Sequence, residues 1–345
     1  MKKIYSILVF LLLLGFSGCA QKVQIQALNP AEVGQMASKK RVVVADFKSD
    51  TVGLSSKIES IISRSVLDKK KYFTVLNRKS LQKVLEEQEL QSSGLSDEKT
   101  AVKVGALIGA EAMMTGEVIS SGSEDSYIED KEKCVSRYKD SGECAQIKYY
   151  KVTCRTTAAE VSASLNIVDL EDGTVIYGDT ISKSYNGDSC KDGDIYFLDM
   201  DTTKIHSKDK ALQLLSDAIA SDFVWKLVPH YYSFEVFILD SIEFEVTDAQ
   251  EKKLKKSLKF LEVGRMDRAE PLMSELNDEL EGASYVVNYD LGVMKEAAAN
   301  YVEAKKLYET ADSLTAEPVE EINMAMVRID ALIVKQKEAE SQIKK

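Results

Sequence analysis

The sequence predicts two folded parts, an α/β domain over residues 41–231 and an all-α domain over residues 246–345. Three observations predict this division. From residue 41 to about residue 118, β-branched runs alternate with stretches whose apolar residues recur at helical spacing. A strict alternation of apolar residues around 161–177 adds a β-hairpin. Beyond residue 248 the pattern is helical to the end, and two stretches match each other with a period of 35.

The first 18 residues predict an export signal. Lys2 and Lys3 precede an apolar run from Ile4 to Phe16, which is short of the roughly 20 residues that a membrane-spanning helix needs. Small residues then lead to Cys19. This ending resembles the bacterial lipobox, in which acyl chains are attached to the cysteine before cleavage in front of it. The resemblance implies that Cys19 is lipidated; an ordinary secretory cleavage nearby is the alternative.

The residues after Cys19 predict which membrane holds the lipid anchor, and they predict a tether. Ala20 stands where an Asp retains many lipoproteins in the inner membrane, so we expect the outer membrane and its periplasmic side. Residues 19–40 contain Pro30 and show no sustained periodicity. We therefore expect them to form an irregular tether between the lipid and the folded body.

The net charge makes one class of binding partner unfavourable, and the cysteine content predicts cross-links. A formal charge of −11 makes nucleic acid an unfavourable partner, because its phosphates need clustered Lys and Arg. Beyond Cys19, an even number of cysteines remains in an oxidising compartment, which predicts two disulfides with three possible pairings. The alternative is a four-thiolate zinc site, although the spacings of 10, 10 and 36 contain no Cys-x-x-Cys pair. These four residues are Cys134, Cys144, Cys154 and Cys190.

Residues 41–118 carry a dense set of motif residues. They are Phe73-Thr74-Val75-Leu76-Asn77-Arg78, Glu87-Gln88, Ser93-Gly94, Gly105, Gly109-Ala110 and Thr115-Gly116. In this order and spacing they resemble the CsgG/HfaB family of envelope lipoproteins, the curli production assembly/transport type. The resemblance implies a mixed sheet with flanking helices and a role in the cell envelope. No phosphate-binding glycine motif is present, so the glycines are expected to serve turns and close packing.

The middle of the chain departs from that family. Residues 120–160 are polar and charged, so we expect an insertion in loop conformation, cross-linked by its cysteines; residues 183–204 also have the pattern of a loop. In curli-type secretion members the corresponding region supplies membrane-spanning hairpins. Charges at this density cannot face lipid cheaply, which argues against a channel here.

The C-terminal domain resembles tetratricopeptide repeats. A connecting strand over 232–245 leads to two helical stretches in which Ala269 aligns with Ala304. The second stretch carries Leu291-Gly292, Tyr308, Ala311 and Pro318 in the order usual for the repeat. We expect about two repeats and a capping helix over 319–333. Such repeats commonly bind peptides on a concave surface; the alternative is that they pack on the neighbouring domain.

Catalytic chemistry finds little support. His206 and His230 stand alone, and the sequence contains no nucleophile-elbow or H-E-x-x-H motif. We expect no enzyme, no cofactor and no metal. The sequence therefore favours a non-enzymatic outer-membrane scaffold or assembly factor that binds envelope proteins, with a possible homo-oligomer. The first alternative is a subunit of an oligomeric secretion channel of the CsgG type, and the second is an enzyme with an unrecognised site.

Overall fold

A computed structural model describes residues 22–87, 98–191 and 205–344. The chain forms two compact units. Residues 31–229 make an α/β unit, and the residues up to Pro30 join His230–Lys344 in a helical unit. The predicted fold class, a mixed α/β sheet with flanking helices followed by a helical region, is confirmed.

The α/β unit is built on a five-stranded mixed sheet. Its strands lie in the order β5 (Thr74–Val75), β2 (Arg41–Val44), β6 (Ala112–Arg137), β7 (Cys144–Asp169) and β8 (Val175–Asp188). Strand β2 is parallel to both of its neighbours, β5 and β6, whereas β6–β7 and β7–β8 pair antiparallel. The hairpin predicted around 161–177 is confirmed as the β7–β8 connection.

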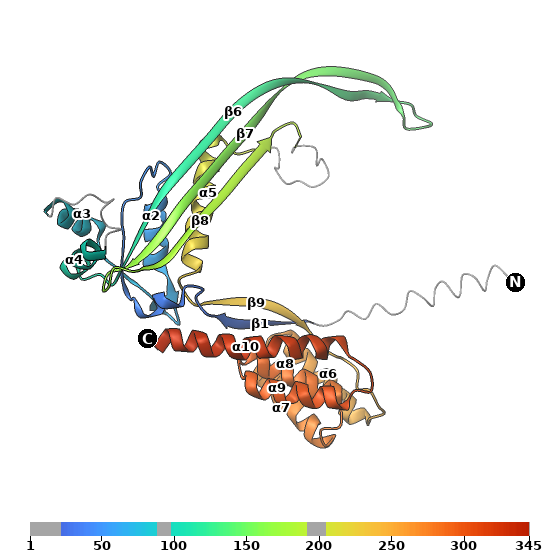
Figure 1. The fold of residues 1–345 in the computed structure, drawn as a ribbon. Coiled ribbons are helices and arrows are strands. Elements are labelled where there is room, and N and C mark those ends of the chain that lie inside the picture. The colour runs from blue at the N-terminus through green and yellow to red at the C-terminus, as the bar shows by residue number, and fades with distance from the viewer. Residues whose placement is uncertain (1–21, 88–97, 192–204, 345) are drawn as a thin grey trace. The chain divides into compact units, whose positions relative to one another are not determined.

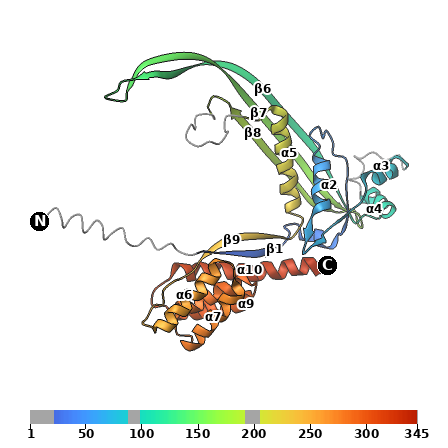
Figure 2. The same cartoon turned by 180° about the vertical axis from the view of Figure 1, so that it is seen from behind.

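Helices cover both faces of the sheet (Figures 1 and 2). The helix α5 (Lys208–Trp225) packs on strands β6, β7 and β8 and on the helix α2 (Leu54–Arg64). On the opposite face, α3 (Arg78–Glu87) and α4 (Glu98–Ile108) cover one end of the sheet, with Val43 and Met113 in their shared core. The remaining short elements are a 3-10 helix at Gly34–Ser38, β3 (Val66–Leu67) and β4 (Lys70–Lys71).

The family motif residues have structural roles. Arg78 forms ion pairs with Asp46 and Glu59, each at 2.7 Å, and so fixes the start of α3 against α2 and the end of β2. Gly109 ends α4 with φ +70°, a conformation that favours glycine. A Cβ on Gly116 would lie 2.7 Å from the backbone oxygen of Ser164 on the neighbouring strand. Gln88, Ser93 and Gly94 lie outside the described residues.

The prediction that residues 120–160 form a loop is wrong. Strands β6 and β7 each run for 26 residues and pair continuously from Ala112↔Asp169 to Arg137↔Cys144, with an irregularity near Cys134. Likewise, β8 continues to Asp188, into the stretch expected to be a loop. Polar side chains do not prevent strand pairing, because the backbone supplies the hydrogen bonds.

The prediction that residues 19–40 form an irregular tether is also wrong for residues 22–40, the part that the structure describes. Residues Lys22–Asn29 form a strand, β1, which pairs antiparallel with β9 (His230–Phe237). Val23, Ile25 and Ala27 alternate into the core of the helical unit, while the residues between them are exposed. The expected connecting strand is thus half of a two-stranded ribbon that belongs to the helical unit.

Five helices complete the helical unit. They are α6 (Asp248–Glu262), α7 (Met266–Glu279), α8 (Tyr285–Ala297), α9 (Tyr301–Leu314) and α10 (Glu320–Lys344). The small residues noted in the sequence allow close packing: Ala269 and Ala304 are fully buried, and a Cβ on Gly292 would lie 2.5 Å from the ring of Tyr308. The ribbon lies along α10 and also contacts α8 and α6 (Figure 2).

A buried ion pair ties the last three helices together. The Glu296 carboxylate on α8 is fully buried and accepts hydrogen bonds from Arg328 on α10, at 2.7 and 2.9 Å, and from the hydroxyl of Tyr308 on α9. The Arg328 guanidinium lies 5.6 Å from the ring of Phe234 on β9. Burial alone would lower the pKa of Arg328, but the bonds to Glu296 raise it overall.

Candidate functional site: the hairpin arm

The outer half of the β6–β7 hairpin has no neighbours in the sheet. The pairing of β7 with β8 stops at Thr156↔Asp188, whereas β6 and β7 stay paired as far as Arg137↔Cys144. We call the two-stranded part, residues 126–155, the hairpin arm. Within the described chain no other strand pairs with it, and Figure 1 shows it extending well past the end of β8.

The base of the arm is bonded to the end of β8 and to Cys190, which follows it. A disulfide joins Cys154 to Cys190, with their Cα atoms 5.4 Å apart; we call it the base disulfide. The Tyr127 hydroxyl donates to the Asp188 carboxylate at 3.0–3.1 Å, and Lys131 Nζ donates to the Cys190 carbonyl at 2.8 Å. The arm is therefore held in a defined direction relative to the sheet.

The same contacts shift two titrating groups. The backbone N–H of Cys190, together with the Tyr127 hydroxyl, lowers the pKa of Asp188 against the opposing effect of desolvation. Desolvation and the nearby Asp188 raise the pKa of Tyr127. Both groups thus keep, at neutral pH, the protonation states that the hydrogen bond between them needs.

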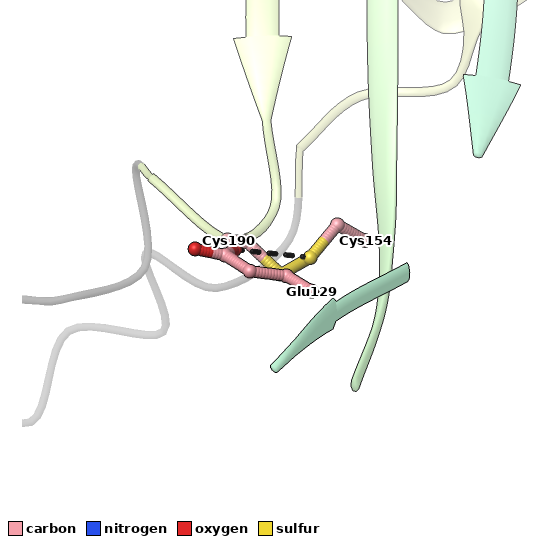
Figure 3. A group of neighbouring side chains, drawn as sticks. All are labelled: Glu129, Cys154 and Cys190. Atoms are coloured by element: carbon pink, nitrogen blue, oxygen red, sulfur yellow. Dashed lines mark hydrogen bonds between the residues drawn. A yellow bond between two sulfur atoms is a disulfide. The ribbon is translucent and has the colours of Figure 1, made fainter. Parts of the chain in front are cut away.

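The base disulfide also bears on metal binding. Glu129 lies beside it, with a carboxylate oxygen 3.4 Å from the Cys154 sulfur (Figure 3). A disulfide sulfur carries no proton, so this is a close contact rather than a hydrogen bond. These three residues are the only group in the described chain with metal-ligand atoms close together. Because both sulfurs are in the S–S bond, an ion could use them only after reduction.

A second disulfide closes the tip of the arm. Cys134 and Cys144, with Cα atoms 5.7 Å apart, form what we call the tip disulfide. The turn between the strands is closed by the bond from Tyr138 N to the Glu143 carbonyl, and Gly142 adopts φ +72°. Of the three pairings that the sequence allowed, the structure thus contains 134–144 with 154–190. The four cysteines do not converge into a four-thiolate zinc site.

Both faces of the arm mix charged and apolar side chains. Directly opposed residues share a face, so Lys133 and Lys148 lie on one face while Asp130 and Lys151 lie on the other. Between these charges, bulky apolar and aromatic side chains are exposed; they are Tyr127, Ile128, Val135, Tyr138, Ile147, Tyr149, Tyr150 and Val152. A surface rich in tyrosine with scattered charge is typical of protein–protein contacts.

This surface could not be predicted from the pattern of apolar residues. The runs YIEDKEK and IKYYKV contain β-branched and aromatic residues that favour strands. The apolar alternation that identifies a half-buried strand is missing, because neither face of the arm is buried.

One side of the helices in the helical unit is covered by the ribbon of β1 and β9. Val23 and Ile25 of β1 and Val236 of β9 are buried in the same core as the helices. Tyr232 and Phe234 pack on this core, and Lys335 of α10 lies 5.5 Å from the Tyr232 ring. A peptide site on this side would require the ribbon to leave, so the unit offers its outer surface and its edges instead.

The remaining residues singled out in the sequence do not form a site. The His206 ring lies 5.5 Å from the Tyr185 ring, and His230 is the first residue of β9. A pocket of about 210 Å³ lies beside Arg78, whose charge is already engaged by Asp46 and Glu59. Cys19 lies outside the described residues. Within them, every helix is too short or too polar to traverse a bilayer.

Comparison with known proteins identifies the family to which this architecture belongs. The α/β unit is a mixed sheet that ends in a long hairpin and is flanked by the helices α2–α5. The family model described as "Curli production assembly/transport component CsgG" matches residues 23–221, more than half of the chain. The chain therefore belongs to the CsgG family, and the predicted resemblance is confirmed.

Two solved structures are similar at low identity. One is lipoprotein GNA1162 from Neisseria meningitidis, at 13% identity and a TM-score of 0.28, covering 53% of this chain and 97% of that chain. The other is the hypothetical protein CT253 from Chlamydia trachomatis, at 12% identity and a TM-score of 0.28, covering 54% of this chain and 94% of that one. No curated protein matches the chain.

Proposed function

We propose that this protein is a lipid-anchored, non-enzymatic scaffold on the periplasmic side of the outer membrane, which holds other envelope proteins through its hairpin arm during assembly or secretion. The anchor is the lipid expected on Cys19. The observation that carries the proposal is the arm itself: two paired strands that no other described element covers, with exposed Ile128 and Tyr149 and a disulfide at each end.

The stability of the hairpin arm supports this proposal. An isolated two-stranded ribbon is marginally stable in water, so a chain that only had to fold would not keep one this long. Closure of a 10-residue loop by the tip disulfide stabilises the ribbon by about 3 kcal/mol in the chain-entropy description. The free edges and exposed tyrosines then remain available to a partner, either by strand addition or by side-chain packing.

The experiment is photo-crosslinking in intact cells. A photoreactive residue replaces Tyr149 on the arm, which is 64% exposed; the control replaces Val175 at the start of β8, which is 63% exposed. We expect discrete adducts with other envelope proteins from position 149 and none from position 175. Equal labelling at both positions, or none at either, would reject the arm as the binding surface.

A second candidate is a subunit of an oligomeric secretion channel. The long hairpin with unpaired outer edges favours it, because the edge of β6 in one copy could pair with the edge of β8 in the next. The charges on both faces oppose it, because each Lys or Arg turned to lipid at mid-depth costs about 2–4 kcal/mol. Crosslinks from position 149 only to other copies of this chain would favour the channel.

A further inference from the structure

The distance between the anchor and the first strand restricts where the helical unit can lie. Only Ala20 and Gln21 separate Cys19 from Lys22, the first residue of β1. Three steps of fully extended chain span at most about 11 Å. A headgroup layer is itself about 5–7 Å thick, so a lipid on Cys19 leaves no room for the helical unit to stand away from the bilayer.

The surface around Lys22 is known from the structure. A groove of about 440 Å³ lies between the start of β1 and the α6–α7 turn; Lys22, Leu261, Glu262, Gly264 and Met266 are among its lining residues. Both views show α6 beside the start of β1 (Figures 1 and 2).

Apolar side chains are exposed at this edge. Val263 in the α6–α7 turn is 68% exposed. Phe237, which is 45% exposed, lies opposite Lys22 in the ribbon, and Lys22 Nζ is 4.9 Å from the centre of its ring. Aromatic and basic side chains in combination are typical of the headgroup region of a membrane.

Charge points the same way. Residues 252–268 contain seven Lys or Arg and only two acids, in a chain whose formal charge is −11. Lys252, Lys256 and Lys259 recur at helical spacing on the exposed face of α6, and none of them forms a salt bridge with a described carboxylate. Nearby acids are partly engaged: Glu235 pairs with Lys22 and Asp267 with Arg265, whereas Glu262 is exposed in the groove.

We propose that the helical unit lies directly on the anionic phospholipid surface that holds the anchor, with the α6–α7 turn and Phe237 at headgroup depth. The lysines of α6 then face the lipid phosphates. The inference rests on the proposed lipidation of Cys19. It deepens the proposed function by giving the protein a second, electrostatic contact with its membrane beside the lipid.

The test measures depth in the bilayer. In a Trp225→Phe background, Val263→Trp reports on the proposed contact and Val327→Trp on α10, where Val327 is 80% exposed, serves as the control. The lipidated full chain is placed in vesicles of phosphatidylethanolamine and phosphatidylglycerol that contain a lipid with brominated acyl chains. We expect quenching at position 263 and little at position 327. Equal quenching at both, or none at either while the protein floats with the vesicles, would overturn the proposal.

Two further measurements keep the anchor and the contact apart. If the native chain floats with the vesicles no better than the Cys19→Ala chain, the lipid anchor is wrong and the inference falls with it. In the Cys19→Ala chain, binding to phosphatidylglycerol vesicles should fall about fivefold for each of Lys252, Lys256 and Lys259 changed to Gln, the equivalent of about 1 kcal/mol each. Lys305→Gln on α9 is the control; equal binding by all variants would contradict the electrostatic contact.

Discussion

Replacing Arg328 by Met should strongly destabilise the helical unit. The substitution removes two charge-assisted hydrogen bonds, of 2.7 and 2.9 Å, from a Glu296 carboxylate that has no exposed surface. Leaving a buried charge without its partner costs about 3–5 kcal/mol. The Arg328 side chain is itself about one-fifth exposed, so we expect the lower end, about 3 kcal/mol.

The assay is urea unfolding followed by two spectroscopic probes, circular dichroism and tryptophan fluorescence. Circular dichroism at 222 nm follows mainly the helices, while fluorescence follows Trp225, the only tryptophan, which lies in the α/β unit. With a slope of about 1–3 kcal/mol per molar urea, a loss of 3 kcal/mol moves the midpoint by about 1 M or more. The fluorescence transition should stay in place.

The control breaks an exposed ion pair between α9 and α10, two of the three helices that the buried pair ties together. Asp330→Asn removes the 2.7 Å contact with Lys305, whose side chain is one-third exposed. It should cost less than about 1 kcal/mol. Changing Glu296 to Gln together with Arg328 to Met should recover much of the loss, because no buried charge remains. The reasoning is refuted if Arg328→Met costs no more than the control.

Other consequences concern burial, cross-links and close packing. Asp290 is fully buried, one of its oxygens has no partner, and desolvation raises its pKa well above its usual value. Asp290→Asn should therefore raise the free energy of unfolding by about 1–3 kcal/mol at pH 7. A raised pKa penalises the folded state only above the pKa that the carboxyl has in the unfolded chain, so the gain should vanish when thermal unfolding is measured below about pH 4. Changing both cysteines of the base disulfide to Ala should cost about 4 kcal/mol and the tip disulfide about 3, because their separations are 36 and 10 residues; equal midpoints in urea would contradict this. Gly292→Ala places a Cβ against Tyr308 and should lower stability by about 1–3 kcal/mol in the 222 nm transition, whereas Ala at exposed Val263 should change it little.

Elements with an apolar face could be predicted from the sequence. Leu54, Ile58 and Ile62 recur at helical spacing and are fully buried in α2, and the alternation of Val161, Ala163 and Leu165 gave the inner half of β7 correctly. In these elements burial and periodicity coincide, so the pattern of apolar residues carries the information.

Two features lay beyond this kind of reasoning. The arm has no buried face, so its strands leave no apolar period to detect. The strand β1 is short, and its partner is more than 200 residues away, as in Lys22↔Phe237; pairing at that distance is fixed by the assembled helical core and not by local sequence. The disulfide pairing likewise depends on β8 ending beside β7, where Cys190 meets Cys154.

The oligomeric state of the protein distinguishes a lipid-tethered scaffold from a ring that spans the membrane. Light scattering gives the mass of the purified lipoprotein in mild detergent and of the Cys19→Ala chain without detergent. A scaffold that is tethered by its lipid and does not span the membrane predicts that the Cys19→Ala chain stays dispersed and small, near the 38.4 kDa of the full sequence less its export signal. A large ring that requires detergent even without the lipid would contradict the account, because charged strands of the arm would then face the membrane.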